Sequence, residues 1–200
     1  MICVVDYEAG NLKSVELVLR HLGADFKISK RPEDLAAADR LIFPGVGEAF
    51  SSMKVLSDSG LGSAVKEFAA SGRPLLGICV GCQVLFDFSE ERSTGCLSVL
   101  PGKVVEFPAD SGLKVPHMGW NQVAHGGRHQ IFDGIPDNSS FYFVHSYYPV
   151  PASIDIEIGR TEYGIGFTSA VARDNVVATQ FHPEKSGEIG LKLIQNFINL

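Results

Sequence analysis

The sequence predicts an α/β fold, a single domain over residues 1–200 with a mixed, mostly parallel central sheet flanked by helices and additional antiparallel strands. Up to Phe88, short apolar segments alternate with segments whose apolar residues recur at helical spacing. This alternation is typical of right-handed βαβ units, which build a parallel sheet. Beyond Phe88, apolar segments follow one another closely, with Gly, Pro, Asp and Asn between them. Such short intervals favour antiparallel pairing.

The first part of the chain is expected to supply the parallel strands and their helices. Apolar runs predict strands at Ile2–Val5, Asp25–Ile28, Arg40–Phe43 and Leu75–Ile78. Helical periodicity predicts helices at Leu12–Leu22, from Pro32, and at Ala49–Leu56, Leu61–Ala70 and Val80–Phe86. Gly23 and Gly72 stand where a left-handed residue ends a helix, and Pro32 suits a first helical turn.

The second part is expected to be rich in strands. After a polar loop at Ser89–Gly95, strands are predicted at Leu97–Leu100, Val104–Phe107, Gln122–Ala124, Phe141–Tyr147, Ile154–Thr161, Phe167–Ala172 and Val176–Phe181. Arg173-Asp174-Asn175 is typical of a hairpin turn between the last two strands. Ser186 can cap a final helix, whose apolar face comprises Ile189, Leu193, Ile194 and Phe197.

Composition argues against several classes of protein. The formal net charge of −6 disfavours a nucleic-acid-binding protein, which usually carries a basic patch. No apolar run approaches the ~20 residues of a membrane-spanning helix, and the first residues lack the features of a secretory signal. We therefore expect a cytoplasmic protein with no membrane contact. In that reducing compartment Cys3, Cys79, Cys82 and Cys96 are expected to be free thiols.

Residues 75–85 hold the strongest candidate for a catalytic residue. Cys79 lies where a predicted strand passes into a predicted helix, and Gly77 and Gly81 flank it. This is the arrangement of a nucleophile elbow, in which the glycines allow a sharp turn and the close approach of a substrate. The positive end of the helix dipole favours the thiolate. The structural alternative is a cysteine that only packs in the core.

A second candidate is His182-Pro183-Glu184, which follows a predicted strand. Residues two apart in an extended chain point to the same side, so Glu184 can hold one imidazole nitrogen of His182. The other nitrogen is then free to act as a base toward a thiol. The structural alternative is a turn histidine beside a solvated glutamate. With Cys79, these residues form a candidate Cys–His–Glu triad.

Other motifs are less specific. Pro44-Gly45-Val46-Gly47 can supply backbone N–H groups to an oxyanion, or can be only a tight turn. Cys79-x-x-Cys82 suggests a redox or zinc site, but no second ligand pair has matching spacing, so no metal is expected and Cys82 is expected to pack in its helix. Trp120 suits either the core or an interface, and the aromatic segment Phe141–Tyr148 suits either the core or the wall of a site.

Together these motifs resemble the triad (class I) glutamine amidotransferases. The resemblance rests on Gly77-Ile78-Cys79-Val80-Gly81-Cys82-Gln83 and Phe181-His182-Pro183-Glu184. Within that family the chain is similar, over nearly its whole length, to the glutaminase subunits of imidazole glycerol phosphate synthase, an enzyme of histidine biosynthesis. This narrower resemblance is carried by Asp6-Tyr7, Gly10-Asn11-Leu12, Pro44-Gly45-Val46-Gly47, Pro116-His117-Met118-Gly119-Trp120-Asn121 and His182-Pro183-Glu184-Lys185-Ser186.

The resemblance implies a glutaminase that acts through a γ-glutamyl thioester. Cys79 would attack the side-chain amide of glutamine, His182 would transfer the protons, and Glu184 would orient His182. Backbone N–H groups of Val80 and of the loop at Val46 and Gly47 would hold the oxyanion. The residues implied in glutamine binding are Gly47, Gln83, Glu91, His145, Ser146 and Tyr147.

The resemblance also implies a second protein as partner, and no cofactor. A (β/α)8 cyclase subunit would form a heterodimer with this chain and receive the ammonia, making imidazole glycerol phosphate and aminoimidazole carboxamide ribonucleotide. Trp120, Asn121 and Lys185 are expected near that interface. Three rivals stay open: the glutaminase of another synthase, such as that of anthranilate or pyridoxal phosphate synthesis, a thiol hydrolase of esters or peptides, and a non-catalytic scaffold.

Overall fold

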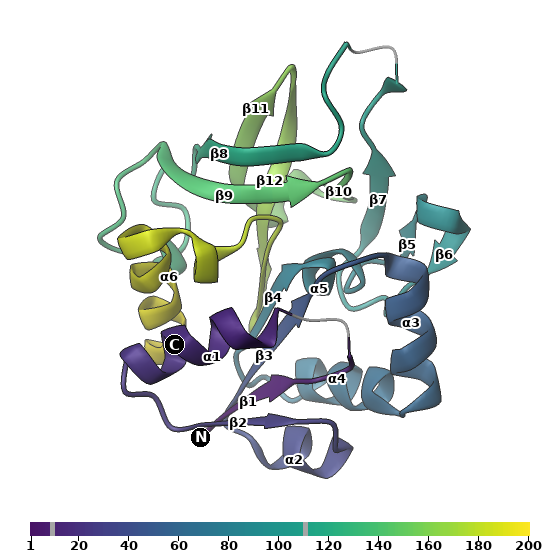
Figure 1. Ribbon diagram of the computed structural model, residues 1–200, viewed down its shortest axis with the longest axis vertical. Coiled ribbons are helices and arrows are strands. Elements are labelled where there is room, and N and C mark those ends of the chain that lie inside the picture. Colours follow the sequence, from purple (N-terminus) through teal and green to yellow (C-terminus); the bar gives the residue numbers. More distant parts are fainter. Residues whose placement is uncertain (9–10, 110–111) are drawn as a thin grey trace.

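A mostly parallel sheet forms the centre of the computed structural model, which describes residues 1–8, 11–109 and 112–200. Its order is β11-β12-β13-β4-β3-β1-β2 (Figure 1). The strands are β1 (Ile2–Val5), β2 (Phe26–Ser29), β3 (Arg40–Gly45), β4 (Leu75–Cys79), β11 (Glu157–Tyr163), β12 (Ile165–Arg173) and β13 (Val176–Thr179). The strands from β2 to β13 are parallel, whereas β12 and β11 continue the sheet antiparallel at one edge. The predicted mixed, mostly parallel sheet is confirmed.

Helices cover both faces of this sheet. They are α1 (Leu12–His21), α2 (Pro32–Ala37), α3 (Ala49–Asp58), α4 (Leu61–Ala70) and α6 (Gly187–Asn199). In Figure 1, α1 and α6 lie together on one side, and α3 and α4 lie on the other. Strands that are covered on both faces read as continuous apolar runs. Accordingly, every residue of β1, β4 and β13 is buried.

The later strands form two smaller sheets beside the central one. One has the order β10-β7-β5-β6 and comprises β5 (Phe88–Ser89), β6 (Thr94–Gly95), β7 (Gly102–Glu106) and β10 (Tyr147–Pro151). The other pairs β8 (His117–Val123) with β9 (Ser139–His145), antiparallel. A bridge from Tyr142 to His182 ties β9 to the segment that follows β13. Short 3-10 turns complete the fold: η1 (Glu91–Ser93), η3 (Gln130–Phe132), η4 (Ile154–Ile156) and η5 (Pro183–Lys185).

Two predicted elements differ from the structure around the elbow. The helix predicted at Val80–Phe86 is only α5 (Val80–Gln83), because the amides of Leu85 and Phe86 bond to carbonyls three residues back and tighten the chain. The strand predicted at Leu97–Leu100 is wrong. Its amides donate to the carbonyls that follow α5, as in the 2.9 Å bond from the Leu97 nitrogen to the Val84 oxygen.

Other differences between prediction and structure are smaller. The polar loop predicted at Ser89–Gly95 carries the short strands β5 and β6 at its ends, and the segment predicted at Phe141–Tyr147 divides between β9 and β10. Ser186 stands at the N-cap position of α6, but its hydroxyl donates to the His182 carbonyl instead of capping. The loop at Asp6–Asn11 includes residues 9–10, which lie outside the described residues. Over the ranges described, no helix has the length and apolar character needed to cross a membrane.

Glycines allow β3 and β4 to approach α5 closely. A Cβ on Gly81 would lie 1.9 Å from the Phe43 carbonyl oxygen, and one on Gly77 would lie 2.8 Å from the Leu85 side chain. A Cβ on Gly45 would lie 2.6 Å from the Gly81 nitrogen. No real side chain tolerates such distances, so glycine at these positions sets the separation between the end of β3 and the elbow.

We expect Gly81→Ala to destabilise the fold, because the added methyl group must displace the end of β3. The cost expected for overpacking is about 1–3 kcal/mol in the free energy of unfolding, measured by urea denaturation. Gly95→Ala is the matched control, since a Cβ there meets nothing within 4 Å. Equal denaturation midpoints for the two variants would contradict this account of the packing.

Candidate active site

Cys79 occupies a strained position between β4 and α5. Its backbone has φ 56° and ψ −113°, in a region that residues other than glycine seldom adopt. Such a conformation costs about 1–3 kcal/mol and persists only where the surroundings enforce it. Gly77 and Gly81 provide that enforcement, because they let the chain on both sides of the turn pack tightly. The predicted nucleophile elbow is thus present, although the helix after it has a single turn.

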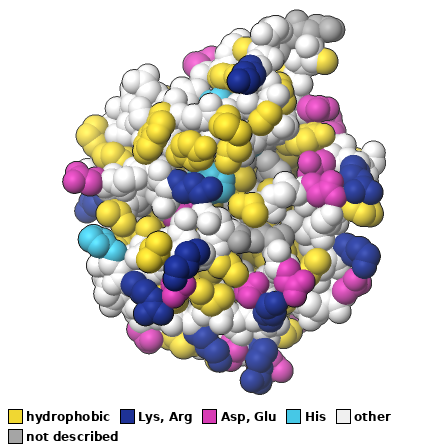
Figure 2. Space-filling model, in the orientation of Figure 1, with side chains coloured by type: hydrophobic (Ala, Val, Ile, Leu, Met, Phe, Trp, Pro, Cys, Tyr) yellow, Lys and Arg dark blue, Asp and Glu magenta, His cyan; other side chains and the backbone are white. Residues whose placement is uncertain are grey.

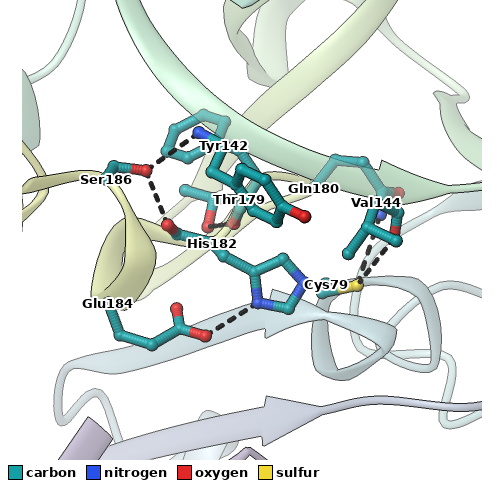
Figure 3. Close-up of polar contacts among 9 residues, drawn as sticks. Cys79, Tyr142, Val144, Thr179, Gln180, His182, Glu184 and Ser186 are labelled. Atoms are coloured by element: carbon teal, nitrogen blue, oxygen red, sulfur yellow. Dashed lines mark hydrogen bonds and ion pairs between the residues drawn. The ribbon is translucent and has the colours of Figure 1, made fainter. Parts of the chain in front are cut away.

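His182 and Glu184 form a buried pair just beyond β13. The distance from His182 Nδ1 to Glu184 Oε1 is 2.7 Å, and both side chains are 1% exposed. The backbone holds this segment in place. The His182 amide donates to the Tyr142 carbonyl at 2.9 Å. The Ser186 hydroxyl donates to the His182 carbonyl at 2.6 Å, as Figure 3 shows.

The sheet brings Cys79 and His182 together. Strands β4 and β13 are parallel neighbours, with Ile78 opposite Thr179, so both chains leave the sheet at the same edge. The imidazole of His182 lies between Glu184 and Cys79 (Figure 3). Its Nε2 makes no hydrogen bond among the described residues, and the Cys79 thiol instead donates to the Val144 carbonyl at 3.9 Å.

Two opposing effects set the protonation of His182. Burial lowers the pKa of this imidazole, but the neighbouring Cys79 and Glu184 outweigh burial and raise the pKa to about 10. An anionic sulfur and a carboxylate beside the ring thus favour the imidazolium, as required once a proton has passed from the thiol to His182.

A pocket of about 260 Å³ opens in front of Cys79. This volume lies just below the roughly 300–1,000 Å³ typical of small-molecule sites. Its lining residues are Val46, Gly47, Cys79, Val80, Gln83, Glu91, Pro116, Val144, His145, Ser146, Tyr147 and His182. Every residue that the sequence implicated in oxyanion or glutamine binding is among them. Pro116 and Val144 were not predicted, because only the pairing of β8 with β9 places them there.

Glu91 connects the pocket to the predicted oxyanion loop. Its Oε2 accepts a hydrogen bond of 2.6 Å from the amide of Ala49, the first residue of α3. The segment Pro44–Gly47 ends β3 and leads through Glu48 into that helix, and Gly47 has φ 92°, a value suited to glycine. Burial raises the pKa of the Glu91 carboxyl. Glu91 therefore contacts the start of α3 with one oxygen while it lines the pocket.

Gln83 lines the pocket, and hydrogen bonds hold the nitrogen of its side-chain amide in place. Its Nε2 donates to the Tyr147 carbonyl at 3.1 Å and to Gln180 Oε1 at 3.0 Å. Both amide hydrogens are thereby used, which leaves the Gln83 oxygen to accept a hydrogen bond from a ligand.

His145 lines the pocket but has no free ring nitrogen. Its Nδ1 donates to the Tyr147 carbonyl at 2.7 Å, so its Nε2 accepts from Nδ1 of His117 at 2.9 Å. His117 Nε2 in turn accepts from the Asn121 amide at 3.2 Å. Burial lowers the pKa of His145 to about 3 and that of His117 to about 4. Both imidazoles are therefore neutral and serve to position their neighbours.

Trp120, Asn121 and Lys185 lie outside the pocket. Trp120 is 59% exposed on β8, and its ring meets Tyr142 edge-on at 6.1 Å. The ammonium group of Lys185 lies 5.9 Å from the Tyr142 ring. Asn121 faces inward to the Glu162 carbonyl and His117. Trp120 and Lys185 thus mark an outer face, whereas Asn121 belongs to the packing behind it.

Cys82 packs in the interior. It is fully buried in α5, and burial raises the pKa of its thiol. All four cysteines are free. This agrees with a packing role, since a redox pair needs an accessible thiol of lowered pKa.

The chain matches known proteins along its length. Residues 3–200 match the family model described as glutamine amidotransferase class-I. The subunit HisH of imidazole glycerol phosphate synthase from Dehalococcoides mccartyi (strain ATCC BAA-2266 / KCTC 15142 / 195) is 51% identical, covering 100% of this chain and 97% of the relative. The HisH subunit from Methanosarcina acetivorans is 48% identical, with 100% and 98% covered.

Solved structures share the fold. The structure of PurLQS from Thermotoga maritima superposes with a TM-score of 0.77 at 17% identity, covering 99% of this chain and 97% of that one. This likeness concerns the fold alone. Sequence identity near one half over the full length is what assigns the narrower group, so the chain belongs to the class I glutamine amidotransferases, in the family of the HisH subunit of imidazole glycerol phosphate synthase.

Proposed function

We propose that this protein hydrolyses glutamine to glutamate and ammonia at Cys79 and delivers the ammonia to a cyclase subunit. The observation that carries the proposal is the buried His182–Glu184 pair beside a strained cysteine at the wall of a small pocket. The full-length similarity to HisH subunits supports the choice of glutamine as substrate and of imidazole glycerol phosphate synthase as the assembly. It also disfavours the rival synthases considered above.

The first half of the reaction forms a thioester. His182 Nε2 takes the thiol proton, and the Cys79 sulfur attacks the side-chain carbonyl carbon of glutamine. The carbonyl oxygen becomes an oxyanion, for which the backbone N–H of Val80 and those of the Val46–Gly47 loop are the proposed donors. The tetrahedral intermediate collapses as His182 gives its proton to the departing nitrogen, and ammonia leaves.

The second half regenerates the thiol. Water attacks the γ-glutamyl thioester while His182 takes one of its protons, and the proton returns to the sulfur as glutamate leaves. Glu184 keeps the imidazole oriented and stabilises its charged form throughout. In the pocket, the free Gln83 oxygen and Glu91 are proposed to bind the polar groups of glutamine, and Gly47, His145, Ser146 and Tyr147 to shape the walls.

The partner is proposed to bind the outer face of β8–β9. Hydrophobic side chains gather over these strands in Figure 2. Met118 is 62% and Trp120 59% exposed there, and Val144 on the same face also lines the pocket. An exposed apolar surface that continues into the site suits a (β/α)8 cyclase subunit that receives ammonia in a heterodimer. Cytoplasmic location, as expected from the sequence, is part of the same proposal.

Cys79→Ala is expected to abolish glutamine hydrolysis, because Cys79 supplies the one thiol among the described residues that line the pocket. Ammonia release with glutamine as substrate measures the effect, and labelling by a glutamine-analogue electrophile should be lost as well. A complex with the cyclase should still turn over when ammonium is added. Glutamine hydrolysis by this variant would refute the triad, and hydrolysis of esters or peptides without glutamine preference in the natural protein would favour the thiol hydrolase.

Glu184→Gln is expected to lower kcat by about 10²-fold or more, because an amide cannot stabilise the imidazolium as a carboxylate does. Loss of the negative charge lowers the pKa of His182, so the imidazolium loses its proton at a lower pH. The alkaline limb of the kcat/KM profile should therefore move to lower pH. Glu188→Gln, an exposed change in the first turn of α6, serves as control. An unmoved alkaline limb in Glu184→Gln would count against this role of Glu184.

Trp120→Ala is expected to weaken the complex with the cyclase subunit by about tenfold or more, because it truncates the largest exposed side chain of the β8–β9 face. Calorimetric titration with purified cyclase measures the dissociation constant. Ile154→Ala removes another exposed hydrophobic side chain, 64% exposed on η4, and should leave the constant unchanged. Equal dissociation constants for both variants would place the interface elsewhere.

A further inference from the structure

Gln180 lies beside the reacting sulfur although it does not line the pocket. It directly follows β13 and is fully buried. Its backbone N–H donates to the Ser169 carbonyl at 2.9 Å. The chain bends at Gln180 and Phe181, and the backbone of His182 is again extended. Despite this bend, the side chains of Gln180 and His182 both lie beside Cys79 (Figure 3). The ring of Phe181, between them in the chain, packs against Phe141 with 4.2 Å between the ring centroids.

The side-chain amide of Gln180 is used at both ends. Its Nε2 donates to the Cys79 sulfur at 3.8 Å, a contact drawn in Figure 3. Its Oε1 accepts from Gln83 Nε2 at 3.0 Å. A buried amide that is bonded at both ends has a fixed orientation, and here one end faces the sulfur.

Which end faces the sulfur follows from the neighbours. The Tyr147 carbonyl can only accept, so the Gln83 atom 3.1 Å from it must be nitrogen. The same Gln83 nitrogen also contacts Gln180, which must therefore present its oxygen to Gln83. The NH₂ group of Gln180 is left to face Cys79. The orientation is thus anchored to the backbone of β10 through Gln83.

We infer that Gln180 serves the reaction as a fixed amide donor to the Cys79 sulfur, held in orientation by Gln83. In the thiol form the sulfur accepts from Gln180 and donates to the Val144 carbonyl. Once the proton has moved to His182, the sulfur can no longer donate to Val144, whereas the bond from Gln180 strengthens because its acceptor is charged. Gln180 therefore favours the thiolate over the thiol. The inference rests on the proposed role of Cys79 as nucleophile.

Other ionisable groups also face this sulfur. His182 does so with Glu184 behind it, whereas Tyr7, whose hydroxyl lies beside Gly45, and Cys82 on α5 are close enough for Cys79 to raise their pKa values further than burial alone does. His145 stands near His182 but is neutral, and Glu91 lies across the pocket. Substitutions at Gln180 leave all of these groups in the chain. A change in the reactivity of Cys79 in such variants is then assigned to the amide.

The test is the rate of alkylation of Cys79 by iodoacetamide as a function of pH, with the labelled site identified by mass spectrometry. Cys96→Ser is the background, since Cys96 is half-buried and the other two cysteines are fully buried. Gln180→Met removes the donor at similar volume, and Gln180→Glu places an anion beside the sulfur. Gln195→Met makes the same chemical change on α6, away from the site, and is the matched control.

Gln180→Met is expected to slow alkylation at pH 7 by about tenfold and to move the midpoint of the pH profile upward by about one unit. Gln180→Glu should do so more strongly, and Gln195→Met should match the parent. In glutamine hydrolysis, kcat of Gln180→Met should fall by a similar factor with KM nearly unchanged, because Gln180 does not line the pocket. Gln83→Met should raise KM and also slow alkylation.

The double variant decides whether Gln83 acts through Gln180. The combined slowing in the double variant should be less than the product of the two single effects, since Gln180→Met removes the bond to the sulfur and Gln83→Met misorients that same bond. A folded Gln180→Met or Gln180→Glu with the parent pH profile would overturn the inference, and so would multiplicative effects in the double variant. Alkylation needs no glutamine, so these results stand apart from the activity of Cys79→Ala, which tests the proposed function itself.

Discussion

The parallel pairing of β4 with β13 is the constraint on which the site depends. Cys79 ends the first strand and His182 follows the second, and they are far apart in the sequence. Their register places both chain exits at one edge of the sheet, which is where parallel sheets bind ligands. Both strands are buried on both faces, so a change of register would displace closely packed side chains on each face. The geometry of the candidate triad is therefore fixed by the core of the protein.

The end of β3 imposes a second constraint. A Cβ on Gly81 would overlap the Phe43 carbonyl, and a Cβ on Gly45 would overlap the backbone of α5 at Gly81. This contact sets the predicted oxyanion loop against the elbow at Cys79. The strain in the Cys79 backbone is tolerated because the packing on both sides leaves no relaxed alternative. Glycine is thus required at positions 45 and 81 because the two backbones lie so close together. The residue with the positive φ is Cys79.

The parts of the fold and site that local patterns determine could be predicted from the sequence. Alternating strands and helices predicted the sheet, which is confirmed. Cys79 and His182-Pro183-Glu184 predicted the candidate triad, because each motif is short and its spacing is directly visible. The strand predicted at Leu97–Leu100 was wrong because an apolar run does not reveal that its amides are taken by the turn after α5. Gln180 and Val144 were missed because their contacts with Cys79 depend on how distant strands meet.

The site contains two kinds of buried histidine, and the difference between them is physical. Burial lowers the pKa of His145 and of His182 alike. His145 faces only a carbonyl and another imidazole, so it stays neutral, whereas Glu184 and Cys79 raise the pKa of His182 above its ordinary value. When two side chains of the same type have pKa values pushed apart by their surroundings, the difference indicates which one can act as acid or base. In the proposed mechanism proton transfer therefore falls to His182, and His145 can hold the Tyr147 carbonyl without adding a charge beside the sulfur.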